Sequence, residues 1–112
     1  MAITNPKLDG YLFLDEMYRD DFFPNSLVDK GKAILVELCE QLETEKPMEA
    51  EEVFQLTHAA TESFNDLQEE FYECDSEIET AARECIAADF EFITKAYGYE
   101  LDVEELIAPR DW

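Results

Sequence analysis

Six apolar residues recur at intervals of three and four positions between residues 53 and 71, and this rhythm constrains the fold more than any other feature of the chain. The six are Val53, Leu56, Ala60, Phe64, Leu67 and Phe71. Residues at this spacing share one face of an α-helix, because each helical turn takes about 3.6 residues. The pattern therefore predicts a long amphipathic helix over residues 48–73, with its apolar face against a core.

Two further helices are predicted before this segment. In residues 6–22 apolar side chains recur every three or four positions, and Pro24 ends the pattern. Ser26 is suited to be the N-cap of a second helix, which extends to Lys46. The two apolar faces consist of Leu8, Tyr11, Leu14, Tyr18 and Phe22, and of Leu27, Ile34, Leu35, Leu38 and Leu42. Only a few residues separate the second helix from the third, so these two are expected to lie antiparallel.

The C-terminal part of the chain carries two capping patterns. Ser76, with Glu79 three residues later, forms a capping box for a fourth helix, which Gly98 can end in a left-handed conformation. Asp102 and Glu105 repeat the pattern before a short last turn. Together these segments predict an all-α fold, an up-down bundle of four main helices plus a short C-terminal helical turn.

Length and composition favour one small acidic domain over residues 1–112. Hydrophobic residues make up 46% of the chain, which is enough apolar material for a single core. The 29 Asp and Glu residues outnumber the 8 Lys and Arg residues, and the resulting net charge of -21 disfavours binding to nucleic acid or to an anionic membrane. Because no long apolar run and no targeting segment is recognisable, we expect a cytoplasmic protein.

The three cysteines give no sign of a disulfide framework or a zinc site. Cys39, Cys74 and Cys85 are odd in number and lack the short spacing of a metal-binding pair. Acidic neighbours oppose thiolate formation, so a redox role is disfavoured. We expect all three to be reduced side chains that fill space in the core.

An acidic interval separates Lys46 from Arg83, with eleven Asp and Glu residues and no Lys or Arg between them. Four of these acids recur at helical spacing on the side opposite the apolar face of the third helix. They are Glu62, Asp66, Glu69 and Glu73. Their charge either serves solubility or forms a docking surface for a basic protein, whose association a complementary potential would accelerate.

Two carboxylates are predicted to point inward. Asp89 follows Ile78 by eleven residues, which places both on one helical face, and Asp15 lies on the apolar face of the first helix. Burial raises the pKa of a carboxyl group unless a donor compensates. The possible donors are Tyr11, Tyr18, Arg19, Lys30 and Arg83, of which Tyr18 and Lys30 are favoured for Asp89. Asp15, Tyr18, Lys30 and Asp89 therefore define a candidate polar pocket, which is either a structural hydrogen-bonded pair or an acid–base site.

No recognised catalytic or metal-binding pattern is present. The single histidine, His58, is predicted to face solvent beside Glu62. A di-iron bundle needs Glu-x-x-His pairs on two helices, but position 55 is Gln55 and there is no second histidine. No glycine-rich phosphate loop occurs. The sequence therefore predicts no catalytic residue, no metal and no cofactor.

Several segments carry a family resemblance in combination. They are residues 17–24 (MYRDDFFP), 27–31 (LVDKG), 76–83 (SEIETAAR), 90–93 (FEFI) and 104–112 (EELIAPRDW). With these segments the chain resembles, over nearly its whole length, a bacterial family of small proteins known as domain of unknown function 5713. The resemblance implies a helical bacterial protein, and it implies no established activity and no assigned site residue.

Two functional hypotheses follow from these observations. The first is a non-enzymatic interaction protein, most concretely a cytoplasmic immunity or inhibitor protein that masks a basic toxin or enzyme with its acidic surface. The alternative is a small enzyme or ligand-binding domain that uses the polar pocket around Asp15, Tyr18, Lys30 and Asp89. A deep polar cavity at these four residues would favour the alternative, and a packed core would remove it.

Overall fold

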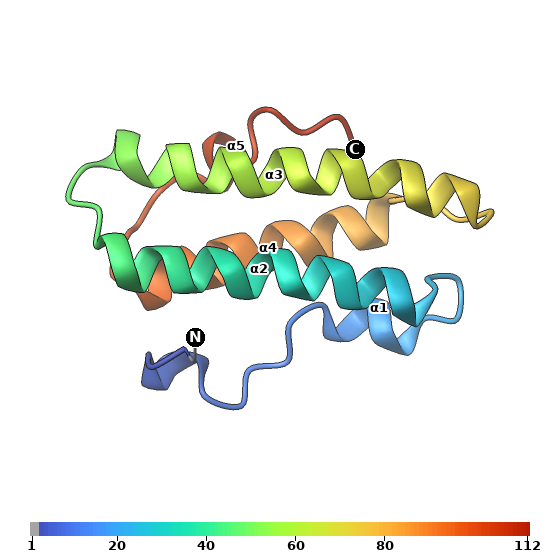
Figure 1. The fold of residues 1–112 in the computed structure, drawn as a ribbon, viewed down its shortest axis with the longest axis horizontal. Helices are drawn as coiled ribbons and strands as arrows, with labels where there is room; N and C mark the ends of the chain where they lie inside the picture. Colours follow the sequence, from blue (N-terminus) through green and yellow to red (C-terminus); the bar gives the residue numbers. More distant parts are fainter. Residues whose placement is uncertain (1–2) are drawn as a thin grey trace.

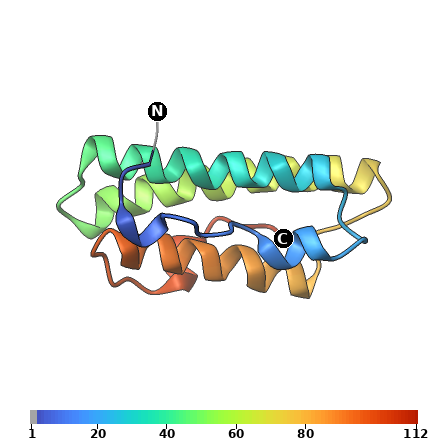
Figure 2. The same cartoon turned by 90° about the horizontal axis from the view of Figure 1, so that it is seen from below.

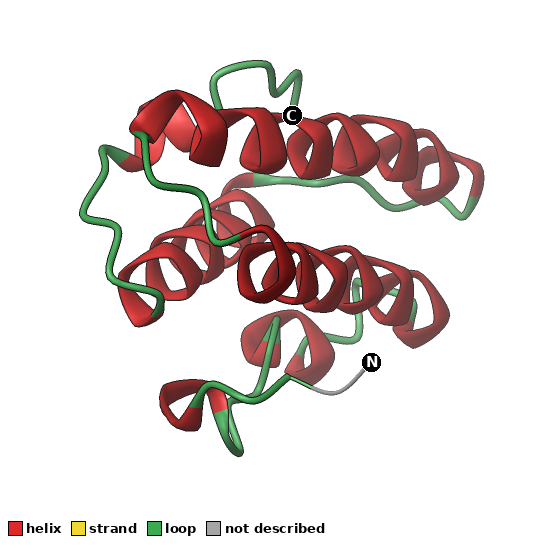
Figure 3. Ribbon diagram, turned by 60° about the vertical axis from the view of Figure 1, so that its left-hand side comes forward, coloured by secondary structure: helices red, strands yellow, loops and turns green. Residues whose placement is uncertain are grey.

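The structure is a computed structural model that describes residues 3–112. Its elements are a 3₁₀ turn at Pro6–Leu8 and the helices α1 (Asp15–Arg19), α2 (Asn25–Glu45), α3 (Ala50–Glu73), α4 (Thr80–Ala96) and α5 (Val103–Leu106). Every regular element within the described range is helical (Figures 1 and 3). The predicted all-α class is therefore confirmed.

The three long helices alternate in direction (Figure 1). α2 packs along α3, and α4 runs back across the same core, so consecutive helices are antiparallel as predicted. The segment before α1 lies between α2 and α4 when the molecule is seen from below (Figure 2). At the opposite side, α5 contacts both α3 and α4, and the chain after α5 follows the outer side of α3.

The predicted apolar face of α3 is buried at five of its six positions, and Leu56 is only half-buried. Thr57 and Thr61 are fully buried beside this face. A threonine can enter a core when its hydroxyl is bonded locally, and the Thr61 hydroxyl donates to the Thr57 carbonyl at 2.8 Å. The Phe64 ring lies 6.0 Å from that of Phe90 on α4, which joins α3 to α4 through the core. The core face therefore includes polar residues that apolar periodicity does not identify.

The predicted helix over residues 6–22 is wrong for most of its length. Gly10 and Leu14 have φ angles of 74° and 56°, and left-handed residues cannot continue an α-helix. The segment therefore turns twice and forms only the 3₁₀ turn and α1. Leu8 and Leu14 are nevertheless buried, so part of the predicted apolar set reaches the core without forming one continuous helical face.

Two predicted helix starts also need correction. α2 begins at Asn25 directly after Pro24, so Ser26 lies inside its first turn. α4 begins at Thr80, and the Ser76 hydroxyl instead donates to the Phe22 carbonyl at 3.0 Å. Ser76 therefore joins two connecting segments, and the predicted capping box at Ser76 and Glu79 is wrong.

Two predictions for the C-terminal part, at Gly98 and at Asp102, are confirmed, and the structure adds an observation at Gly31. Gly98 follows α4 with φ of 90°, and the Asp102 carboxylate caps α5 by accepting the Glu104 N–H at 3.0 Å, both as predicted. Gly31, inside α2, allows a close approach, because a Cβ atom there would lie 2.9 Å from Cδ1 of Leu14 and 3.1 Å from Cε1 of Phe64. Glycine at this position lets the segment before α1 pack directly on α2.

The cysteines are free but not all buried. Cys39 and Cys85 lie in the core, whereas Cys74 is exposed, so the prediction that all three fill the core is wrong for Cys74. Burial raises the pKa of the Cys39 thiol to about 12 and that of Cys85 to about 11, with nearby carboxylates adding to both shifts. None of the helices within residues 3–112 has the length and apolar character needed to cross a membrane.

Candidate functional site

The four predicted acids of α3 are all exposed. Glu62, Asp66, Glu69 and Glu73 follow one outer face of the helix over three turns, and we call this surface the α3 acidic face. Among residues 3–112, no lysine, arginine or histidine forms an ion pair with any of these four carboxylates. The surface therefore carries a charge that no described residue neutralises.

The two borders of the α3 acidic face are built differently. On one side, Lys30 of α2 forms an ion pair with Glu70. On the other side, the chain after α5 is held against α3, because the Asn65 amide donates to the Pro109 carbonyl at 3.1 Å and accepts the Asp111 N–H at 3.0 Å. Fixed neighbours on both sides keep the acidic face as an open strip.

His58 contacts the C-terminal segment that contains α5. Its Nε2 lies 2.7 Å from the Glu105 carbonyl oxygen, and its ring stacks on Phe54 with 5.7 Å between the ring centroids. The side chain is half-buried, so the prediction of a solvent-facing histidine beside Glu62 is wrong. The segment containing α5 covers this position, and helical spacing within α3 does not reveal a segment that arrives from elsewhere in the chain.

Asp89 points inward as predicted and is only 4% exposed. Its two carboxylate oxygens accept hydrogen bonds from the Tyr11 hydroxyl and from the Leu14 N–H, the latter at 2.7 Å. The favoured donors are wrong, because Tyr18 instead donates to Asp29 at 2.5 Å and Lys30 pairs with Glu70. Asp89 therefore fixes the segment before α1 to α4.

The pKa values of Asp89 and of the two tyrosines, Tyr11 and Tyr18, are shifted by burial and by hydrogen bonds. Burial raises the pKa of Asp89 above its ordinary value of 3.8, while the bonds from Tyr11 and Leu14 pull in the opposite direction and nearby acids add to the increase. Burial and the bond to Asp89 raise the pKa of Tyr11. Partial burial and the bond to Asp29 raise the pKa of Tyr18 to about 12. Both tyrosine hydroxyls are therefore protonated donors at neutral pH.

The predicted polar pocket does not assemble from its four residues. A cleft of about 610 Å³ is lined by Asp15 and Asp89 together with Tyr11, but Tyr18 and Lys30 are not among its lining residues. The Asp15 side chain is 37% exposed and pairs with Arg19 at 2.8 Å, so it does not point into the core as predicted. The cleft thus contains two of the four expected residues, and Asp89 is already bonded to the chain itself.

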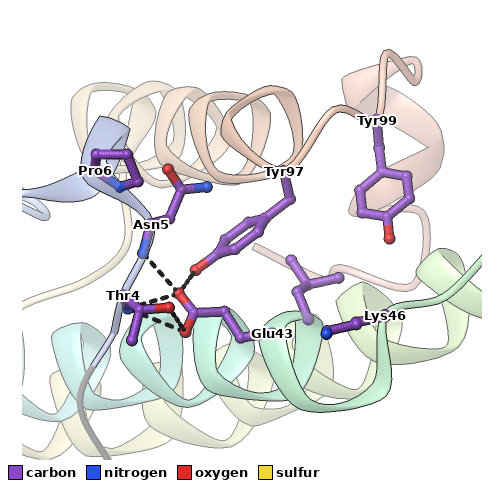
Figure 4. A pocket seen from close by; sticks show the side chains of 8 residues that line it. Thr4, Asn5, Pro6, Glu43, Lys46, Tyr97 and Tyr99 are labelled. Carbon is purple, nitrogen blue, oxygen red and sulfur yellow. Dashed lines mark hydrogen bonds between the residues drawn. The ribbon is translucent and has the colours of Figure 1, made fainter.

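Glu43 is a second carboxylate that accepts hydrogen bonds from distant segments of the chain, and the sequence analysis did not identify it. Its carboxylate accepts hydrogen bonds from the Thr4 N–H at 2.9 Å, the Asn5 N–H at 3.1 Å and the Tyr97 hydroxyl (Figure 4). Partial burial opposes ionisation, but these bonds outweigh it and hold the pKa of Glu43 below its ordinary value of 4.5. Its partners lie far away in the sequence, so no local pattern distinguishes Glu43 from a solvent-facing acid.

A cavity of about 420 Å³ lies beside this contact. It is lined by Glu43, Tyr97, Tyr99 and Lys46 (Figure 4). The Tyr99 hydroxyl donates to the Pro47 carbonyl at 2.5 Å. Lys46 ends α2 in the left-handed conformation, with φ of 45°. The cavity is therefore built where α2 and α4 end beside the N-terminal segment.

The chain belongs to the family of unknown function DUF5713, whose model matches residues 7–112. This membership agrees with the resemblance found in the sequence and extends across every helix of the structure. The chain matches no curated protein and no solved structure.

Proposed function

We propose that this protein is a non-enzymatic interaction module whose α3 acidic face binds a basic protein partner. The observation that carries this proposal is the strip formed by Glu62, Asp66, Glu69 and Glu73, which is exposed and has no ion-pair partner among residues 3–112. Like charges at this helical spacing destabilise an isolated helix by a few tenths of a kcal/mol per pair. A feature that the fold does not require is well suited to recognition.

The chemistry of the face defines the partner class. A concentrated negative potential accelerates encounter with a positive surface and disfavours acidic partners. Within this class, we propose a cytoplasmic immunity or inhibitor role, in which the module masks a basic toxin or enzyme. The net charge of -21 supports this role.

The test is a pair of charge reversals with the same net change. Asp66→Lys with Glu69→Lys alters the α3 acidic face, and Asp9→Lys with Glu100→Lys is the matched control, because both control residues are exposed and lie outside α3. Lysates of the source cells are passed over the wild type and both variants. Association rates are then measured for any basic protein that the wild type retains.

We expect such a partner to bind the control at the wild-type rate and the α3 variant at least about tenfold more slowly. The difference should shrink as the Debye length falls from about 10 Å at 0.1 M salt to about 3 Å at 1 M. If every retained protein binds the α3 variant at the wild-type rate in low salt, the proposal is wrong.

The cleft at Asp89 supports a second candidate, a ligand-binding domain or small enzyme. Its volume of about 610 Å³ is within the usual range for small-molecule sites, and its carboxylates favour a cationic ligand. The hydrogen bonds already made by Asp89 weigh against an acid–base role, since both oxygens are used. Titration with spermidine, followed by amide chemical shifts of Leu12 and Ala88, tests this candidate directly.

A further inference from the structure

Two connecting segments meet at one end of the bundle. The connection between α1 and α2 and the connection between α3 and α4 both lie at the right-hand end in Figure 1. They are bonded to each other, because the Ser76 hydroxyl donates to the Phe22 carbonyl at 3.0 Å. The Ser76 N–H also donates to the Phe71 carbonyl at 2.8 Å, which fixes the end of α3 in the same place. This end is therefore a defined surface built from both segments.

Two exposed aromatic residues belong to the segments that meet at this end, one in the connection before α2 and one in the last turn of α3. Phe22 is 43% exposed and Tyr72 is 51% exposed, although each adjoins a buried phenylalanine in the sequence. The ring of Phe22 lies 5.2 Å from that of Phe23, which in turn lies 6.2 Å from that of Phe71. The exposed Phe22 ring is thus held by a chain of ring contacts that leads into the core.

Four exposed acids lie within three positions of these aromatic residues in the sequence. They are Asp20, Asp21, Glu73 and Asp75. No described lysine or arginine forms an ion pair with any of them. We call Phe22 and Tyr72, with these four acids, the aromatic end. Glu73 also belongs to the α3 acidic face, so the two surfaces are continuous.

We propose that the aromatic end is the apolar part of the same interface, and that Phe22 and Tyr72 insert into an apolar patch on the basic partner. This inference rests on the proposed function of the α3 acidic face. Binding energy in protein interfaces concentrates in aromatic anchors, while the surrounding charged rim mainly sets specificity and association rate. The aromatic end adds the anchors that the acidic strip lacks.

The charge of this surface identifies its occupant. A second copy of the chain would bring two acidic rims together, and like-charge contact is unfavourable. An acidic or neutral partner would gain nothing from the four carboxylates. The surface therefore fits a basic protein that presents an apolar patch between lysine or arginine side chains.

Two synthetic helical peptides of equal charge serve as probes. One carries lysine on one face and leucine on the other, and the second has serine in place of leucine. Binding is followed by chemical shifts of the wild-type protein, which avoids any dependence on how a variant folds. We expect the lysine–leucine peptide to bind at least about tenfold more tightly and to shift the signals of Phe22 and Tyr72.

Tyr72→Ala should remove most of this preference, while Met48→Ala is the matched control. Met48 is 92% exposed and precedes α3, at the end of the helix remote from Tyr72. Equal affinity for both peptides, with chemical-shift changes confined to the α3 acidic face, would contradict the proposed role of the aromatic end and leave the proposed function intact. Tighter binding of the lysine–leucine peptide without any change in the signals of Phe22 and Tyr72 would also contradict that role. Failure of both peptides to bind would count against both proposals.

Discussion

The carboxylates that contact the N-terminal segment and those on the outer face of α3 have opposite roles. Asp89 and Glu43, which we call the anchoring carboxylates, accept hydrogen bonds from residues 4, 5, 11, 14 and 97. Together they fix the segment before α1 to α2 and α4. The four carboxylates of the α3 acidic face are exposed and unpaired within residues 3–112. The same type of residue is thus structural in one region and available to a partner in the other.

The difference shows that an acid becomes structural where hydrogen-bond donors from other segments reach it, and that location within a long helix is not enough to decide this. All six of these residues lie within long helices. An acid that satisfies otherwise unbonded donors stabilises the fold, because leaving a buried donor unpaired costs about 1–3 kcal/mol. An acid without such donors adds only repulsion from its neighbours.

The largest effect is expected at Asp89. Asp89→Ala should lower the free energy of unfolding by about 2–3 kcal/mol, because the buried Leu14 N–H and the Tyr11 hydroxyl lose their acceptors. Asp15→Ala is the control, since its contact with Arg19 is a partly exposed ion pair and should contribute less than about 1 kcal/mol. Urea unfolding measures both. Equal losses of unfolding free energy in the two variants would contradict a stabilising role of the hydrogen bonds to Asp89.

A smaller and local effect is expected at Glu43. Because the native pKa of Glu43 is lowered, its contribution to stability is present above its ordinary value of 4.5 and is lost as the pH falls through the native value. The amide signals of Thr4 and Asn5 should therefore move toward unbonded positions on acidification. Glu43→Gln should remove this pH dependence, and Glu45→Gln, an exposed neighbour on α2, should keep it. Identical titrations in all three proteins would contradict the role of Glu43.

Apolar periodicity predicted α2 and α3 to within a few residues at each end and identified α4 with an early start. These helices bury regularly spaced side chains, and that spacing is visible in the sequence. The same spacing failed in residues 6–22, where the left-handed Leu14 is held by a bond to Asp89, 75 positions away. Local periodicity carries no information about such a partner.

The candidate site likewise contains features that local periodicity predicted and features that it did not. The exposure of Glu62, Asp66, Glu69 and Glu73 followed from their position opposite the apolar face of α3. The burial of Asp89 followed from its position on the apolar face of α4. Tyr11 was one of the five possible donors to Asp89, but the favoured donors were Tyr18 and Lys30, and neither the Leu14 N–H nor the contact at Glu43 was predicted. These contacts depend on how distant segments meet. Binding by the α3 acidic face remains a prediction.

The most direct test compares two matched pairs of alanine substitutions by urea unfolding at neutral pH. Each pair removes one Asp and one Glu from long helices, Asp89→Ala with Glu43→Ala in one protein and Asp66→Ala with Glu69→Ala in the other. We expect the first pair to lower the free energy of unfolding by about 3 kcal/mol. The second pair should leave it unchanged or raise it by a few tenths of a kcal/mol. Equal losses in the two proteins would contradict the division between anchoring carboxylates and a face that the fold does not need.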